Sequence, residues 1–145
     1  MDLINTIDIA AGGMTAQRTR LNVISTNLAN ANTTRTDEGT PYRRKTTIFE
    51  ATPAGGTFQE QLQNSLDEQI YGVRVSEIVP VQDEFKRVYD PAHPDADQNG
   101  YVYLPNVNLV QEMVQMLNAN RSYEANAAVI RTAKDMALKA IEIAR

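Results

Sequence analysis

The sequence contains no cysteine, no tryptophan, one histidine and only three phenylalanines in 145 residues. Without cysteine there can be no disulfide, no thiolate nucleophile and no thiolate-bound metal. The single histidine, His93, would leave a zinc ion with an otherwise all-carboxylate set of ligands, which is unusual. The shortage of large aromatic residues limits the size of any apolar core. We therefore expect no metal site, no cofactor and no catalytic centre.

Strong charge and long apolar runs are also missing. The net charge is −4, with residues 1–31 neutral, residues 106–145 at +1 and the middle at −5. A nucleic-acid binder would normally show a basic stripe, so we expect no nucleic-acid partner. No apolar run approaches the roughly 20 residues that span a membrane. Asp2, Asn5 and Asp8 interrupt the start of the chain, so we expect neither membrane insertion nor a cleaved signal peptide.

Glycine and proline are distributed unevenly. All six prolines and five of the seven glycines lie between residues 32 and 105. This divides the chain into an N-terminal assembly helix (1–31), a central β or extended region (32–105) and a C-terminal assembly helix (106–145). The predicted fold class is mainly α with a small β region, in which the terminal helices form an antiparallel, coiled-coil-like pair.

The first helix carries an apolar stripe with a seven-residue spacing. Its members are Ile7, Met14, Leu21 and Leu28. Leu3, Ala10 and Ile24 lie three residues on, and Ile4 and Ala11 lie four residues on. Gly12 and Gly13 interrupt this helix, and two explanations are open. The glycines permit the close approach of another helix, or they mark a kink.

The last helix carries two apolar lines. The first includes Leu109, Met113, Met116, Tyr123, Ile130 and Ile141, and the second includes Val110, Val114, Leu117, Val129, Met136 and Ile143. One face could meet the N-terminal helix of the same chain and the other a neighbouring chain. Either Asn106 or Asn108 could cap the start of this helix.

The middle of the chain has short β-branched and aromatic segments that predict strands at 46–49, 73–75, 86–89 and 101–104. Residues 52–56 read as a turn or linker, and 58–70 as a short helix. The segment 95–100 matches the first half of a calcium loop, but Asn106 stands where the bidentate glutamate should be. A solvated turn is therefore favoured there. The basic run at 41–45 could bind phosphate or an acidic partner, but a charged strand edge that discourages mispairing explains it as well.

Asparagines gather at the end of the first helix and along the last one. Asparagine is a mediocre helix former because its amide competes for backbone hydrogen bonds. At a helix seam, however, such an amide can fix the register of packing. We therefore assign a register-setting role to Asn27, Asn30 and Asn120.

Residues 21–33 (LNVISTNLANANT) resemble the Asn-rich motif near the N-terminus of bacterial flagellar axial proteins, the rod and hook family. Further segments, in order along nearly the whole chain, narrow the resemblance to basal-body rod proteins of the proximal rod. They are 41–45, 72–75, 88–91, 93–97, 100–102, 105–108, 112–114 and 121–126.

The resemblance implies a structural subunit of the rod that crosses the periplasm. It implies terminal helices that pack as the inner wall of a helical tube, around the channel through which the flagellum exports its parts. The implied partners are copies of the chain, other rod proteins, the adaptor at the rod base and, transiently, the flagellar type III export apparatus.

The expected mechanism is torque transmission without chemistry. The predicted assembly interface consists of Ile7, Met14, Leu21, Ile24, Asn27, Leu28, Asn30, Leu109, Met113, Met116, Asn120, Tyr123, Ile130 and Ile141. We also expect 1–31 and 106–145 to be largely disordered in the free subunit and to order on assembly. The alternatives are another rod or hook component and, from other classes, a calcium-dependent helical adaptor or a peripheral membrane binder.

Overall fold

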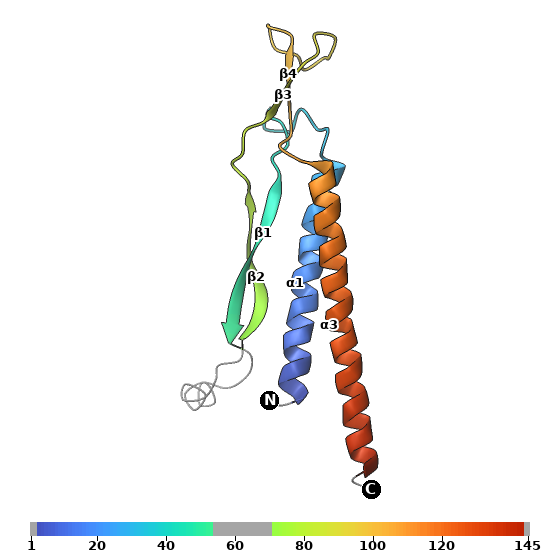
Figure 1. Cartoon of the computed structure of the whole chain (residues 1–145). Coiled ribbons are helices and arrows are strands. Elements are labelled where there is room, and N and C mark those ends of the chain that lie inside the picture. Colours follow the sequence, from blue (N-terminus) through green and yellow to red (C-terminus); the bar gives the residue numbers. More distant parts are fainter. Residues whose placement is uncertain (1–2, 54–70, 144–145) are drawn as a thin grey trace.

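Two long helices, one from each end of the chain, run antiparallel and side by side in the computed structural model (Figure 1). The structure describes residues 3–53 and 71–143. Helix α1 spans Leu3–Ala29 and helix α3 spans Leu109–Ile143. The predicted fold class is therefore confirmed, although α1 ends at Ala29 rather than at residue 31 and α3 begins at Leu109 rather than at residue 106.

Four strands form two separate antiparallel ribbons. Strand β1 (Lys45–Pro53) pairs with β2 (Tyr71–Pro80), and this ribbon lies alongside α1. Strand β3 (Lys86–Tyr89) pairs with β4 (Tyr101–Leu104) in a hairpin beyond the start of α3 (Figure 1). All four predicted strands are confirmed. The helix predicted at 58–70 lies outside the described residues, as does most of the turn predicted at 52–56.

Asn108 caps the start of helix α3, which resolves the choice between the two candidate caps. The Asn108 side-chain oxygen accepts hydrogen bonds from the backbone N–H groups of Val110 and Gln111, at 3.1 and 3.2 Å. These bonds satisfy two of the amides that a helix start leaves without partners. Asn106 has a different task, described below.

The segment 95–100 forms the turn between β3 and β4. The Asp97 carboxylate accepts the backbone N–H groups of Asn99 and Tyr101, at 2.8 and 2.9 Å. These hydrogen bonds, that of Tyr101 above all, hold the pKa of Asp97 below its ordinary value of 3.8. Gly100 closes the turn at a φ of 78°, which glycine adopts without strain. The carboxylate thus organises the turn that the sequence favoured.

The core is built from small side chains and lies mainly between the two helices. The buried apolar residues are Ala10, Ala16, Val23, Ile24, Ala31, Tyr42, Val102, Ala119 and Ala133. This agrees with the shortage of large aromatics in the sequence. Within the described parts of the chain, neither helix is apolar enough over a sufficient length to cross a membrane.

Candidate functional site

The α1–α3 seam keeps one register along its length. Gly13 faces Asn126, and Asn27 faces Glu112, so fourteen residues separate the two contacts on each helix. On α3 the seam positions alternate at spacings of four and three, as in a coiled coil. They are Glu112, Met116, Ala119, Tyr123, Asn126, Ile130, Ala133 and Ala137, all buried or half-buried.

Gly12 and Gly13 allow two neighbours to approach α1 closely. A Cβ atom at Gly13 would stand 2.7 Å from the Asn126 Nδ2 atom, and one at Gly12 would stand 3.2 Å from the carbonyl oxygen of Val73 in β2. Helix α1 continues through both residues. The close-approach explanation is therefore confirmed, since the glycines admit α3 and the β1–β2 ribbon.

Near the end of α1, the side-chain amide of Asn27 makes all of its hydrogen bonds to groups of the same chain. Its Nδ2 atom donates to the Lys45 carbonyl oxygen at 2.8 Å and to Glu112 Oε2 at 3.1 Å. Its Oδ1 atom accepts the Lys45 N–H and the Tyr42 hydroxyl, both at 2.9 Å. An amide has two donors and two acceptor lone pairs, so this side chain is saturated. Asn27 thereby joins α1 to the first residue of β1 and to α3.

Glu112 completes this arrangement from α3. It is 0% exposed, and its Oε1 atom accepts the Arg44 Nε–H at 2.6 Å. The backbone N–H of Arg44 donates to Asn106 Oδ1 at 2.8 Å, and Asn106 Nδ2 donates to the carbonyl oxygen of Val81 at 3.1 Å. A buried charge is tolerated when it is paired and hydrogen-bonded in this way. We call these five residues the polar junction: Asn27, Tyr42, Arg44, Asn106 and Glu112.

Tyr42 shows the electrostatic character of the junction. Burial, and secondarily the negative charge of Glu112, raise the pKa of its hydroxyl above the ordinary value of 10.0. The phenol therefore stays protonated and donates to Asn27 through the physiological pH range. The basic run at 41–45 is thus a structural element of the junction, and Arg43 also stacks on Phe85, 4.4 Å from the ring centroid.

Sequence reasoning missed the junction. It placed Asn27 at the assembly interface, whereas in the structure this amide makes four hydrogen bonds to three residues of the same chain. One signal was available, because Glu112 occupies a position in the apolar four-and-three pattern of α3. A carboxylate there requires a buried partner, and Arg44 in the only run of three consecutive cations was the natural candidate.

The other predicted assembly residues fall into three groups. Ile24 is buried within the chain. A second group is half-buried, namely Ile7, Met14, Leu21, Leu28, Asn30, Met116, Tyr123 and Ile130. A third group is exposed, namely Leu109, Met113, Asn120 and Ile141. The half-buried stripe of α1 runs beside the buried face, which itself centres on smaller residues such as Ala10, Gly13 and Ala16.

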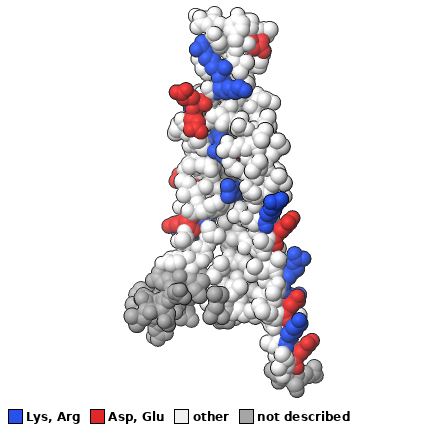
Figure 2. Space-filling model, in the orientation of Figure 1, with Lys and Arg blue, Asp and Glu red and all other residues white. Residues whose placement is uncertain are grey.

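The face of α3 that points away from α1 changes character along the helix. Its first turns expose large apolar side chains, namely Leu109, Val110, Met113, Val114 and Leu117. Lower down it carries charges of both signs, namely Arg121, Glu124, Arg131, Asp135, Lys139 and Glu142. Figure 2 shows basic and acidic side chains alternating down this edge of the molecule. Within the described residues, these six make no ion pair with one another or with the rest of the chain.

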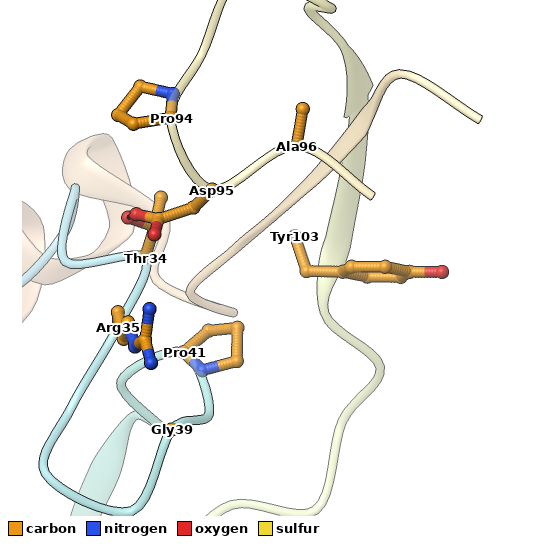
Figure 3. A pocket seen from close by; sticks show the side chains of 8 residues that line it. All are labelled: Thr34, Arg35, Gly39, Pro41, Pro94, Asp95, Ala96 and Tyr103. Atoms are coloured by element: carbon orange, nitrogen blue, oxygen red, sulfur yellow. Dashed lines mark hydrogen bonds between the residues drawn. The ribbon is translucent and has the colours of Figure 1, made fainter. Parts of the chain in front are cut away.

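A pocket of about 330 Å³ lies where the loop after α1 meets the β3–β4 turn (Figure 3). Thr34 and Asp95 point toward each other there, and the Thr34 hydroxyl donates to Asp95 Oδ2 at 2.7 Å. Arg35 lies beside them. The Thr34–Asp95 bond ties the hairpin to the end of α1, so this contact has a structural role.

Comparison with known proteins assigns both ends of the chain. Residues 7–35 match the family described as flagella basal body rod protein, and residues 98–143 match the C-terminal family of the flagellar basal body rod proteins FlgEFG. These ranges contain most of α1, β4 and all of α3. The two family matches therefore cover the helices that form the seam.

Relatives of nearly equal length carry one name. The flagellar basal-body rod protein FlgC of Borreliella burgdorferi is 45% identical over 99% of this chain and 98% of its own length. The FlgC proteins of Escherichia coli O6:H1 and Bacillus subtilis are 41% and 39% identical, again over at least 98% of both sequences. The chain therefore belongs to the FlgC family of flagellar basal-body rod proteins, the structural rod components of the basal body.

Proposed function

We propose that this chain is a subunit of the proximal rod that assembles helically through its terminal helices, transmits torque and lines the export channel. Its neighbours are copies of itself, other rod proteins and the adaptor at the rod base. It reaches the rod, which crosses the periplasm, through the flagellar type III export apparatus. It performs this role by packing, without a catalysed reaction.

The observation that supports this proposal is the large apolar surface left on an already closed helix pair. The large apolar side chains that the two helices leave exposed, within the described residues, are Ile4, Leu109, Val110, Met113, Val114, Leu117, Val129, Met136, Leu138, Ile141 and Ile143. Apolar surface of this extent marks an interaction site on a protein. Because it lies along the outside of an elongated subunit, it suits contacts between unlike faces, which build open helical assemblies.

The half-buried stripe of α1 is the surface we assign to such a contact. Ile7, Met14, Leu21 and Leu28 each bury part of their side chain in the chain and leave part accessible. A neighbouring helix would cover the remainder and gain about 25 cal/mol per Å² of apolar surface buried. The amides of Asn30 and Asn120 would then fix the stagger between chains.

Replacement of Leu21 by Asp tests this assignment. The substitution would bury an unpaired charge at the contact, which costs several kcal/mol. We expect Leu21→Asp subunits to be secreted while rods fail to form and cells do not swim. The matched control is Asn22→Asp, which adds the same charge at the adjacent exposed position. Cells with this control variant should swim.

Two measurements separate failure of assembly from failure of folding. The helical circular dichroism signal of the purified Leu21→Asp chain should match that of Asn22→Asp, and secretion of the two should be equal. If Leu21→Asp cells swim like the parent, the stripe is not an assembly surface.

A further inference from the structure

The first turns of α3 carry a compact apolar surface, which we call the α3 patch: Leu109, Val110, Met113, Val114 and Leu117. All five side chains are at least half exposed, and Val110 reaches 66%. The patch spans nine residues, or about 12 Å of helix. Because Glu112, Met116 and Ala119 face α1, the patch lies on the sides of α3 that its own chain leaves open.

The α3 patch is bounded along the helix. Below it, the same face continues with Arg121 and Glu124, followed by further charges of both signs. On the other side of the patch, α3 starts at its N-terminal cap, Asn108. An apolar surface closed at both ends suits a short apolar segment, because a longer apolar helix would bury the charges that follow.

The opposite end of α3 offers such a segment. The register set by Gly13–Asn126 and Asn27–Glu112 places Leu3 opposite Met136. Residues 138–143, which we call the α3 tip, therefore extend beyond the described part of α1 (Figure 1). The tip exposes Leu138, Ile141 and Ile143, the last of them 87% accessible, while its two charged residues, Lys139 and Glu142, continue the charged face of the helix. Its length, about 9 Å, fits within the patch.

We infer that the α3 patch binds the apolar last turns of the C-terminal helix of an axially neighbouring rod-family chain. The patch and the tip lie at opposite ends of one helix. Each chain can therefore receive a tip at one end and offer its own at the other, a contact that propagates without closing. Residues 98–143 match a family whose name covers other rod proteins. A neighbouring chain of either kind, a copy of this chain or another rod protein, would therefore carry a C-terminal segment of the same family.

The inference rests on the proposed function and adds the pairing of two surfaces to it. Photo-crosslinking in purified basal bodies tests that pairing. The substitution Val114→p-benzoyl-L-phenylalanine places a crosslinker in the middle of the patch, at an exposed side chain that makes no contact essential to the seam. Peptide mapping of the irradiated product should locate the crosslink in the last two turns of a rod protein's C-terminal helix.

The matched control places the same crosslinker at Ala128, an exposed residue on the charged part of the same helix face. It should not give crosslinks to helix ends. Val114→Cys with a thiol-specific crosslinker is a smaller second variant, and its thiol is unique because the native chain has no cysteine. Both Val114 variants should map to the same segment.

The outcomes separate the two proposals. If the variants enter basal bodies but crosslink to the middle of a helix, to a β region, to lipid or to nothing, the pairing inferred here is wrong and the rod assignment stands. If the unmodified chain is absent from purified basal bodies, the proposed function is wrong as well.

Discussion

The two ends of the helix pair are built on different principles. At the upper end, the polar junction fixes α1, β1 and α3 to one another with a buried ion pair and a saturated amide. At the lower end, alanine and glycine line the seam, and α3 extends past α1 with large apolar side chains exposed. The helix angle at the upper end is therefore specified within the chain, whereas we propose that neighbouring chains cover the apolar side chains that both ends of α3 leave exposed.

This difference indicates that the geometry of the subunit and its contacts with other chains depend on different residues. Hydrogen bonds are directional, including those made by buried charged groups, so a junction made of them sets one angle between the helices and the strands. Small-residue packing holds two helices close but contributes little burial per residue. A subunit with both kinds of end can keep a defined geometry while its remaining surface stays available for contacts.

The largest test of this comparison removes the cation of the junction. Arg44→Met leaves Glu112 buried and unpaired, which should lower the free energy of unfolding by about 3–5 kcal/mol. The control, Arg74→Met, removes the exposed ion pair with Glu50 and should cost no more than about 1 kcal/mol. Urea unfolding at pH 7 measures both changes. Equal losses would mean that the junction is no more important than a surface pair.

Amide hydrogen exchange on the isolated chain sharpens the comparison along the helices. We expect the slowest exchange beside the junction, at 23–27 and 112–119, and exchange at least tenfold faster at 3–12 and 130–143. This prediction differs from the expectation that 1–31 and 106–145 are largely disordered in the free subunit, because the polar junction joins the end of α1 to the start of α3 within the chain. Uniform strong protection along both helices would show an autonomous hairpin and contradict the proposed difference between the ends.

A double-mutant cycle probes the close approach at Gly13. Gly13→Ala should gain about 1 kcal/mol from helix propensity, but its methyl group would displace the Asn126 amide. In the parent chain we therefore expect no net gain. In an Asn126→Ala background the gain should appear, giving a coupling energy of about 1 kcal/mol in urea unfolding. If the two backgrounds respond alike, Gly13 and Asn126 are not in contact.

The smallest expected effect lies in the β3–β4 turn. Because the folded-state pKa of Asp97 is the lower one, its contribution to stability is complete above the ordinary value of 3.8. It disappears as pH falls through the folded-state pKa. The backbone amide proton of Tyr101 should titrate with this carboxylate in NMR spectra. In Asp97→Asn that titration should vanish, and a persisting transition would assign it to another group.

Much of the fold follows from local patterns in the sequence. The gathering of all six prolines and five of the seven glycines in the middle predicted both helices, and β-branched segments predicted all four strands, because these signals act over a few residues. The buried face of α1 was harder. Hydrophobicity favoured the stripe through Ile7 and Met14, which is half-buried, while close helix packing also buried Gly13 and Ala16, which lay outside that stripe.

The polar junction could not be read from local signals. Asn27 meets Lys45 across 18 residues and Glu112 across 85 residues of sequence, and no short pattern encodes such pairings. The residues predicted to contact neighbouring chains remain predictions, since their partners belong to other molecules. The sequence does show an asparagine-rich end of the first helix, and Asn27 in that segment is the residue that joins α1 to β1 and α3.

The four-and-three spacing of the α3 seam has a mechanical consequence. A seven-residue repeat falls slightly short of two turns of a straight helix, so helices that keep it wrap around each other with a left hand. A left-handed supercoil winds more tightly when it is twisted in one sense and unwinds when it is twisted in the other. In the rod that we propose, each such helix pair would therefore respond differently to the two directions of twist.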